Sequence, residues 1–165
     1  MQSFPRFLLA GLAAMALAAP VAGQRADDQI QPKSIELMHQ GQSLMAAGKL
    51  EDAENALETA LAIDPRNRWA YVDLARVAEE QRLFGKAMRM TEKALLIEPN
   101  DPDAIAVQGE AMVEMGATAR AQQNLQKLQT ICGGKACPQI AQLSSAISRG
   151  PTVASATAPE SPKSN

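Results

Sequence analysis

A segment that recurs after 34 residues constrains this chain more than any other feature. Ala60 to Pro65 has the sequence Ala-Leu-Ala-Ile-Asp-Pro, and Ala94 to Pro99 has Ala-Leu-Leu-Ile-Glu-Pro. The same interval relates two sets of small residues and one set of large apolar residues, namely Ala53, Ala87 and Ala121, then Gly41, Ala75 and Gly109, then Leu37, Tyr71 and Ile105. A period kept over three copies without insertion predicts a stacked array of one supersecondary unit.

The composition favours helices and makes nucleic acid an unexpected partner. The 165 residues give room for one modest domain. Hydrophobic residues make up 46% of the chain but aromatic residues only 3%, and the abundance of Ala suits closely packed helices better than strands. We therefore expect an all-α protein. The formal net charge is −2 and the basic residues are spread along the chain, so there is no basic field to attract phosphate backbones.

Each copy is predicted to contain two helices. In the first copy, residues 34–67, Ser34 is a candidate N-cap and Gly48 a candidate helix stop. A second helix over 50–63 has its apolar residues at spacings of three and four. This helix should end before Pro65, because proline disfavours helical geometry at the residue that precedes it.

The second copy covers residues 68–101 and the third covers 102–133. The turn between the two helices has Gly48 in the first copy and Gly116 in the third, but Arg82 in the second. A left-handed backbone costs a residue with a side chain roughly 1 kcal/mol more than it costs glycine. We therefore expect the second turn to be built differently.

The third copy has a strong start and an altered end. Asp101 precedes Pro102, which is the pattern of an acidic cap followed by proline at the first helical position. After the third copy, residues 138–148 form another helical pattern, with Ile140, Leu143 and Ile147 as its apolar residues. The last unit of such an array exposes an apolar edge, so this helix is predicted to cap it.

The two ends of the sequence have the composition of segments outside the array. Residues 1–23 contain Arg6, an apolar run and a short small-residue motif, which predicts a cleaved signal peptide. A membrane anchor is the alternative, but the apolar run of about 13 residues is shorter than the roughly 20 that a span needs. Residues 24–33 are interpreted as a flexible lead-in and 149–165 as a disordered tail. The mature protein is thus expected to be periplasmic or secreted, without a membrane span.

The positions of Gly, Ala and Pro within each copy resemble those of tetratricopeptide repeats. The resemblance covers residues 34–133 and is weaker in the third copy, where Leu128 and Gly133 replace the expected Ala and Pro. It implies a right-handed α-solenoid of three helix-turn-helix repeats followed by the capping helix. In the family the first helices of the repeats line a concave groove that binds peptides or proteins, and no catalytic residue is implied.

The resemblance also indicates which side chains would line the groove. The family's groove positions fall on Ile35, Met38, His39, Gln42 and Met45, on Trp69, Val72, Asp73, Arg76 and Glu79, and on Asp103, Val107 and Glu110. Some relatives grip a terminal carboxylate with a clamp of Lys, Asn and Arg, which this sequence lacks. A segment with apolar anchors and some basic character is expected instead, with Trp69 and Arg76 as its main contacts. The alternative is that Trp69 packs beside Arg66 and Arg76 pairs with Glu79 or Glu80 along its own helix.

Candidate catalytic and metal-binding residues are few. His39 is the single histidine, which leaves no second histidine for a catalytic arrangement or a metal set. Glu79, Glu80, Glu110 and Glu114 are candidates for acid–base carboxylates, but the sequence gives them no matched partner and no substrate pocket. We interpret these four as solvated helix faces. We expect no cofactor and no metal.

Cys132 and Cys137 enclose four residues, two of them glycine. In an exported chain this spacing favours a structural disulfide. The alternative is redox or metal chemistry, because Cys137 would lie at the start of the capping helix, where the helix dipole lowers a thiol pKa. The spacing differs from the Cys-x-x-Cys redox motif, and two ligands do not make a structural zinc site.

Three hypotheses for function follow from these observations. The first is a non-catalytic adaptor of the bacterial cell envelope that binds a protein or peptide through its concave groove. The second is a thiol-disulfide accessory protein that uses Cys132 and Cys137. The third is a structural subunit of an envelope assembly.

Overall fold

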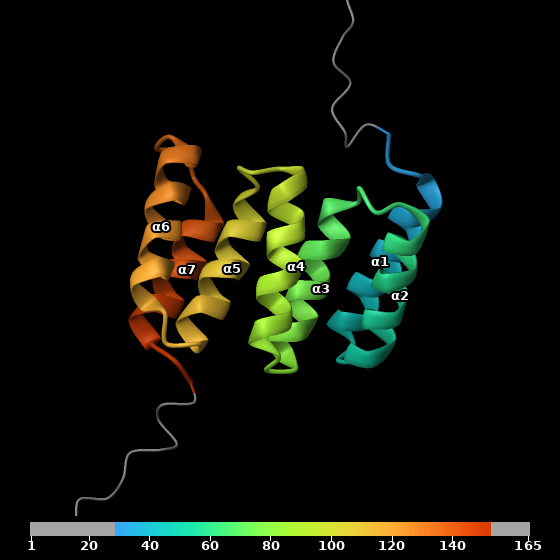
Figure 1. The fold of residues 1–165 in the computed structure, drawn as a ribbon, viewed down its shortest axis with the longest axis horizontal. Coiled ribbons are helices and arrows are strands. Elements are labelled where there is room, and N and C mark those ends of the chain that lie inside the picture. Colours follow the sequence, from blue (N-terminus) through green and yellow to red (C-terminus); the bar gives the residue numbers. More distant parts are fainter. Residues whose placement is uncertain (1–28, 153–165) are drawn as a thin grey trace, which may run out of the picture.

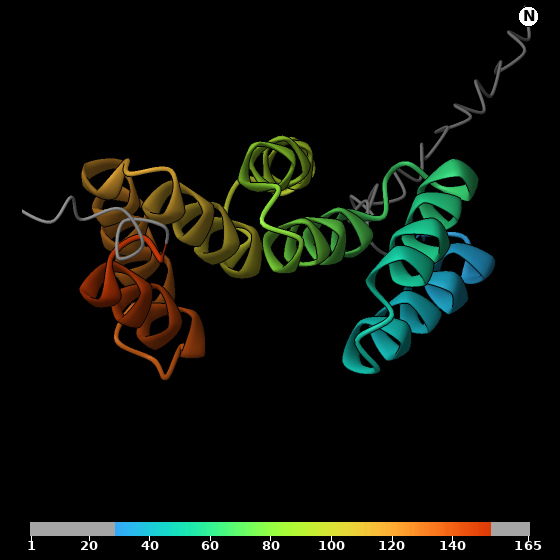
Figure 2. The same cartoon turned by 90° about the horizontal axis from the view of Figure 1, so that it is seen from below.

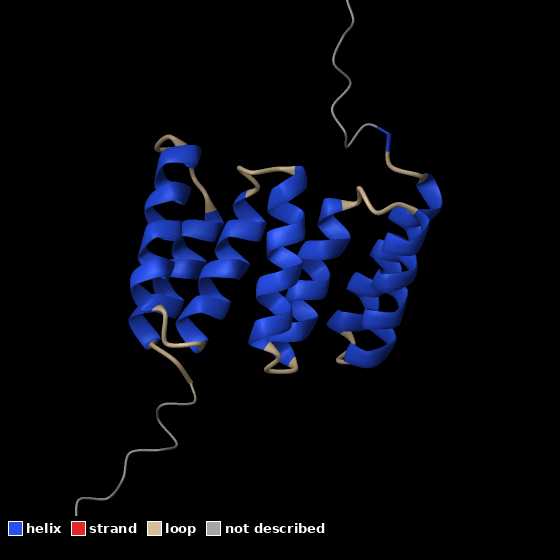
Figure 3. Ribbon diagram, viewed as in Figure 1, coloured by secondary structure: helices blue, strands red, loops and turns tan. Residues whose placement is uncertain are grey.

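The fold consists of helices arranged in one row (Figure 1). A computed structural model describes residues 29–152, and within that range it contains seven helices and no strand (Figure 3). The helices are α1 (Pro32–Ala46), α2 (Leu50–Ile63), α3 (Arg68–Glu80), α4 (Phe84–Ile97), α5 (Pro102–Glu114), α6 (Thr118–Cys132) and α7 (Pro138–Arg149). The predicted signal peptide of residues 1–23 and the predicted tail beyond Thr152 lie outside the described residues.

Consecutive helices pack in pairs, as the repeat predicted. Helix α1 packs on α2, α3 on α4 and α5 on α6, and the second helix of each pair contacts the first helix of the next. Viewed from below, α3 and α5 form the middle of an arc, α4 lies on its outer side, and both ends of the array bend toward the other side (Figure 2). The all-α solenoid of three helix pairs with a capping helix is confirmed.

Small residues allow the closest contacts between helices. A Cβ atom on Gly41 would lie 2.6 Å from Cγ of Leu57, and one on Gly109 would lie 2.6 Å from Cδ1 of Leu143. Both leucines are fully buried. The two glycines therefore make room for large side chains in the core, which is why the second small-residue position of the repeat carries glycine there.

The repeats are joined at equivalent positions by side chains at the start of each first helix. Asn67 caps α3 by accepting a hydrogen bond from the backbone of Ala70, and its Nδ2 donates to Ser34 Oγ at 3.0 Å. One repeat later, Asp101 caps α5 and forms a buried ion pair with Arg68. Ser34 is therefore not the N-cap predicted from the sequence. It is buried inside α1 and links that helix to the next repeat.

The ordered region begins earlier than predicted. Helix α1 starts at Pro32, and Ile30 is 6% exposed. The backbone N–H of Gln31 donates to Oδ2 of the buried Asp64 at 3.0 Å. The prediction of a flexible lead-in over 24–33 is therefore wrong for residues 29–33, because an apolar side chain and a carboxylate of the first repeat hold them.

Helix α7 closes the end of the array against α5 and α6. Leu143 is fully buried in a cluster that also contains Leu128, so the large side chain found in place of the family's Ala fills the space beneath the cap. The predicted tail over 149–165 is wrong for its first residues. Arg149 ends α7, and Thr152 donates to Glu114 from its backbone N–H and its hydroxyl at 3.0 and 2.8 Å.

The turns within the three repeats have the same backbone. Gly48, Arg82 and Gly116 all have positive φ, at 72°, 62° and 77°. After Arg82, the backbone N–H of Leu83 donates to the carbonyl of Ala78 at 2.7 Å, as in a Schellman motif. The expectation that the second turn is built differently is therefore wrong. Arg82 adopts the left-handed conformation in spite of its side chain.

We expect Arg82→Gly to raise the free energy of unfolding by about 0.5 to 1 kcal/mol, because glycine adopts this backbone without a steric cost. Gly116→Ala is the matched control and should lower it by about 1 kcal/mol, since it places a Cβ atom on the same conformation. Urea unfolding followed by circular dichroism measures both values. Equal stability of the two variants would contradict the prediction.

Candidate functional site

We define the concave face as the side of the array that is lined by α1, α3, α5 and α7, toward which the ends of the arc bend (Figure 2). Hydrogen bonds between side chains link each of these helices to the next: Gln42 of α1 to Asp73 of α3, Arg76 of α3 to Asp103 of α5, and Gln142 of α7 to Glu110 of α5. These predicted groove positions therefore share one surface.

The predicted groove residues divide into accessible and buried sets. His39 is exposed, and eight others are partly exposed, namely Ile35, Gln42, Met45, Trp69, Arg76, Glu79, Asp103 and Glu110. In contrast, Met38, Val72, Asp73 and Val107 are 5%, 2%, 2% and 0% exposed. The sequence predicts these four as groove residues, but the structure places them beneath the surface, where they support it. Sequence position alone does not reveal which groove residues the neighbouring helices cover.

A chain of polar side chains runs along the concave face. Oε1 of Gln42 accepts a hydrogen bond from His39 Nδ1 over 3.0 Å, and Nε2 of Gln42 donates to Asp73 Oδ2 over 2.7 Å. Arg76 then bridges Asp73 and Asp103, with nitrogen to oxygen distances of 3.0 and 2.8 Å. The sequence did not predict this chain, because it depends on residues that are about 30 positions apart.

Arg76 mainly compensates the buried carboxylate of Asp73. Burial raises the pKa of Asp73, while the hydrogen bond from Gln42 and the charge of Arg76 lower it. The side chain of Arg76 is 33% exposed, and its guanidinium group pairs with Asp73 and Asp103. The expectation that Arg76 pairs with Glu79 or Glu80 is wrong, and a partner that binds Arg76 would have to compete with two ion pairs.

We expect Arg76→Ala to lower the free energy of unfolding by about 2 kcal/mol at pH 7, since it leaves a buried carboxylate with less compensation. The loss should shrink as the pH is lowered, because burial already raises the pKa of Asp73 and a protonated Asp73 needs no compensating charge. Asp73→Asn in the Arg76→Ala background is the control and should recover most of the loss. Chemical unfolding at pH 7 and at acidic pH measures the free energy of unfolding of each variant. Additive effects of the two substitutions would contradict the prediction.

Trp69 lies at the first turn of α3 and is partly exposed. The guanidinium carbon of Arg68 is 4.2 Å from the centre of the indole ring, a cation–π contact. The ring also packs against the core cluster formed by α1, α2 and α3. The cation over the ring is therefore Arg68 and not Arg66, and part of the ring still faces solvent.

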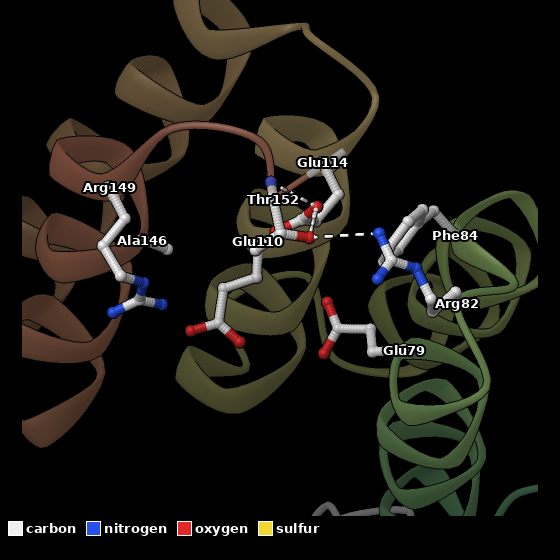
Figure 4. Close-up of a pocket in the computed structure, with 8 residues that line it drawn as sticks. All are labelled: Glu79, Arg82, Phe84, Glu110, Glu114, Ala146, Arg149 and Thr152. Atoms are coloured by element: carbon white, nitrogen blue, oxygen red, sulfur yellow. Dashed lines mark hydrogen bonds between the residues drawn. The ribbon is translucent and has the colours of Figure 1, made fainter. Parts of the chain in front are cut away.

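A cavity of about 270 Å³ opens between α3, α5 and α7. We call it the carboxylate pocket. It is lined by Glu79, Arg82, Phe84, Glu110, Glu114, Ala146, Arg149 and Thr152 (Figure 4). The interpretation of the glutamates as solvated helix faces is therefore wrong for those that line this pocket, and only Glu80 is left on an exposed face. Two predicted groove residues, Glu79 and Glu110, meet in the pocket.

The protonation of the carboxylate pocket departs from that of free glutamates. Burial, together with the charges of Glu110 and Glu114, raises the pKa of Glu79 to about 8. Burial also raises the pKa of Glu110, although the hydrogen bond from Gln142 lowers it. Oε1 of Glu79 is buried and has no hydrogen-bond partner in the described part of the chain. This carboxyl group is therefore largely protonated at neutral pH.

Cys132 and Cys137 form a disulfide in the structure, with their Cα atoms 6.1 Å apart. The bond joins the end of α6 to the residue that precedes α7, and therefore closes the loop beneath the cap. Both residues are partly exposed. The pairing agrees with the structural interpretation of the two cysteines.

Within residues 29–152, no group of three or more His, Cys, Asp and Glu side chains is placed to hold a metal ion. No helix in that range has both the length and the hydropathy to cross a membrane. His39 is exposed and contacts Gln42, at the end of the polar chain.

The sequence model of the tetratricopeptide repeat family matches residues 44–111. A comparison with curated proteins found no match. Among solved structures, the TPR domain of Sgt2 from Aspergillus fumigatus is 21% identical, with a TM-score of 0.66 over 82% of this chain and 88% of that domain.

Two further structures are similar. The TPR2B domain of yeast Sti1, solved in its pHsp70 complex, is 20% identical, with a TM-score of 0.65 over 72% of this chain and 98% of that one. The second TPR of Spaghetti (RPAP3), bound to the HSP90 peptide SRMEEVD, is 20% identical, with a TM-score of 0.59 over 61% and 93%. At such identities these likenesses establish the fold.

Proposed function

The chain is a tetratricopeptide repeat protein, and we propose that it is a non-catalytic adaptor that binds a protein or peptide through its concave face. The observation that carries the proposal is the set of accessible side chains on α1 and α3, with His39, Met45 and Trp69 beside a polar chain. Partly exposed apolar and aromatic groups next to hydrogen-bonding groups are typical of surfaces that bind peptides. The similar structures of RPAP3 with the HSP90 peptide SRMEEVD and of Sti1 in its pHsp70 complex support a binding role for a domain with this fold.

The ligand is expected to differ from the acidic peptide SRMEEVD that RPAP3 binds. The positions at which some relatives carry a clamp for a carboxylate hold Met38, Gln42, Asp73, Asp103 and Val107 in this chain. Two of these are carboxylates, and both are paired with Arg76. A surface with this charge disfavours a terminal carboxylate and favours a segment with apolar anchors and basic character.

We also propose that the adaptor acts in the bacterial cell envelope after removal of residues 1–23. Support comes from the basic and apolar pattern of those residues and from a disulfide, which persists in oxidising compartments. Mass spectrometry of the protein from its native host should find an amino terminus near Gln24. Cytoplasmic material that retains Met1 would contradict this localisation.

Site-specific photocrosslinking in the native host tests the binding surface. A benzophenone side chain at His39 or Met45 reports on the concave face, and one at Glu92, which is exposed on α4, reports on the opposite side. We expect one crosslinked species from the two concave positions and none from Glu92. Trp69→Ala should weaken binding of the captured partner by more than about 1 kcal/mol. Crosslinks that form only at Glu92 would move the interface to the convex side.

A further inference from the structure

We propose that the carboxylate pocket binds the cationic end of a lysine side chain that the partner inserts between α3, α5 and α7. The inference rests on the proposed function and specifies the chemistry of the partner. Neither the repeat pattern nor the comparisons assign this pocket.

The shape and lining of the pocket suit a long side chain with a charged end. Phe84 and Ala146 provide apolar surface, and Glu79 and Glu110 extend toward the space between the helices (Figure 4). The methylene groups of a lysine pack against apolar surface while its ammonium group donates to carboxylates. A volume of about 270 Å³ holds one such side chain and cannot hold a folded element.

An unsatisfied atom points to a missing donor. Oε1 of Glu79 is buried without a hydrogen-bond partner within the described residues. A buried oxygen atom without a hydrogen-bond partner costs free energy, because it has lost its hydrogen bonds to water. An ammonium group in the pocket would supply a donor and an opposite charge at the same point.

The basic residues near the pocket act on its carboxyl groups through their charges, since Arg76 lowers the pKa of Glu79 and Glu110, and Arg149 lowers that of Glu110. Their hydrogen bonds and ion pairs go to other residues. Arg82, from the turn after α3, donates to Thr152, and Arg149, from α7, donates to Ser145. Arg76 forms its ion pairs with Asp73 and Asp103. From α5, Glu110 and Glu114 face Glu79 and add negative charge.

The spacing of the acidic groups favours an organic cation over a metal ion. Three glutamates line the pocket, yet no three acidic groups in residues 29–152 are close enough to share a metal. Metal ions need oxygen ligands at about 2.0 to 2.6 Å, whereas an ammonium group donates over about 2.7 to 2.9 Å in several directions. The wider spacing of the glutamates therefore suits an ammonium group better than a metal ion.

Binding of lysine should be linked to the release of a proton. The pKa of Glu79 is about 8 without a ligand, mainly because the carboxyl group is buried. A cation beside it stabilises the ionised form and lowers this pKa. At pH 7 the protein should therefore lose a proton as the lysine enters.

Carbon-detected NMR of protein labelled at the glutamate carboxyl groups tests the proposal with a defined probe. The probe is Nα-acetyl-lysine methylamide, and the norleucine derivative is its control because it has the same stem without the charge. We expect the lysine probe to lower the titration midpoint of Glu79 by at least one pH unit, with no change from norleucine. Glu79→Gln should weaken lysine binding at least fivefold, and Glu80→Gln, on the exposed face of the same helix, should leave it unchanged.

Two results would overturn the proposal. One is equal binding of the lysine and norleucine probes, and the other is unaltered lysine affinity in Glu79→Gln. Photocrosslinking from His39 and Met45 separates this inference from the proposed function. Crosslinks from the concave face without a response of Glu79 to the lysine probe would support the adaptor function but reject the lysine site. A lysine response without concave crosslinks would retain the pocket as a lysine site and remove the proposed interface.

Discussion

Glu79→Gln is expected to raise the free energy of unfolding by about 3 kcal/mol at pH 9 and to have almost no effect at pH 4. The pKa of Glu79 is about 8 in the folded chain against an ordinary value of 4.5. Between these values the folded chain keeps a proton that the unfolded chain has released. The free energy of unfolding of the native sequence therefore falls as the pH rises from 4.5 to 8. Glutamine keeps the neutral form at every pH and removes this loss.

The size of the effect follows from the shift. A change from 4.5 to about 8 sets an upper limit of about 5 kcal/mol at 1.36 kcal/mol per pH unit. Water at the mouth of the cavity screens part of it, which gives our expectation of about 3 kcal/mol. Chemical unfolding at pH 4, 7 and 9 measures the difference, with Glu80→Gln as the control on the same helix. Parallel pH profiles for the native chain and Glu79→Gln would refute the prediction.

Gly109→Ala should lower the free energy of unfolding by about 2 kcal/mol through overpacking. The added Cβ atom would lie 2.6 and 2.7 Å from the two terminal carbons of Leu143, which is fully buried and cannot turn away into solvent. The loss should appear despite the preference of helices for alanine, which is about 1 kcal/mol. Because Leu143 belongs to α7, the cap should loosen first.

Gly85→Ala is the matched control for this prediction. Gly85 is also helical, but it is exposed, and the nearest atom to an added Cβ is Nη1 of Arg89 at 3.8 Å. This substitution should raise stability by up to about 1 kcal/mol. Amide hydrogen exchange of α7 distinguishes local loosening from global unfolding. Two variants of equal stability would show that the contact with Leu143 does not constrain position 109.

The helix boundaries could be predicted from the sequence because local signals set them. The predicted second helix of the first copy, 50–63, has those ends in the structure, and Asp101 caps α5 as its position before Pro102 predicted. Ser34 was misassigned for a physical reason. A serine at a helix start suits a cap, but Pro32 already begins the helix, and Ser34 instead bonds to Asn67 in the next repeat.

The candidate site was less predictable because its chemistry depends on contacts between repeats. The resemblance placed Arg76 and Glu79 on the correct face. It did not reveal that Arg76 is held by Asp103 from the next repeat, or that Glu79 and Glu110 share one cavity. The same side chains look like ordinary surface charges in the sequence, since a period of 34 residues says nothing about which of them neighbouring helices cover.

The polar contacts that join successive repeats, such as the ion pair of Arg68 and Asp101, determine where the array can be lengthened. Residues 68–101 begin with Arg68 and end with Asp101, so a duplicate of this unit carries both members of its own ion pair. Such a duplicate, inserted after Asp101, would present the next helix with the same cap and keep the register of the array. The segment after Cys132 has no equivalent junction between repeats, because the disulfide ties the end of α6 to Cys137, the residue before α7. The array can therefore be lengthened by inserting whole repeats of 34 residues before the third repeat, whereas its α7 end cannot be extended in this way. Each inserted repeat would lengthen the concave face.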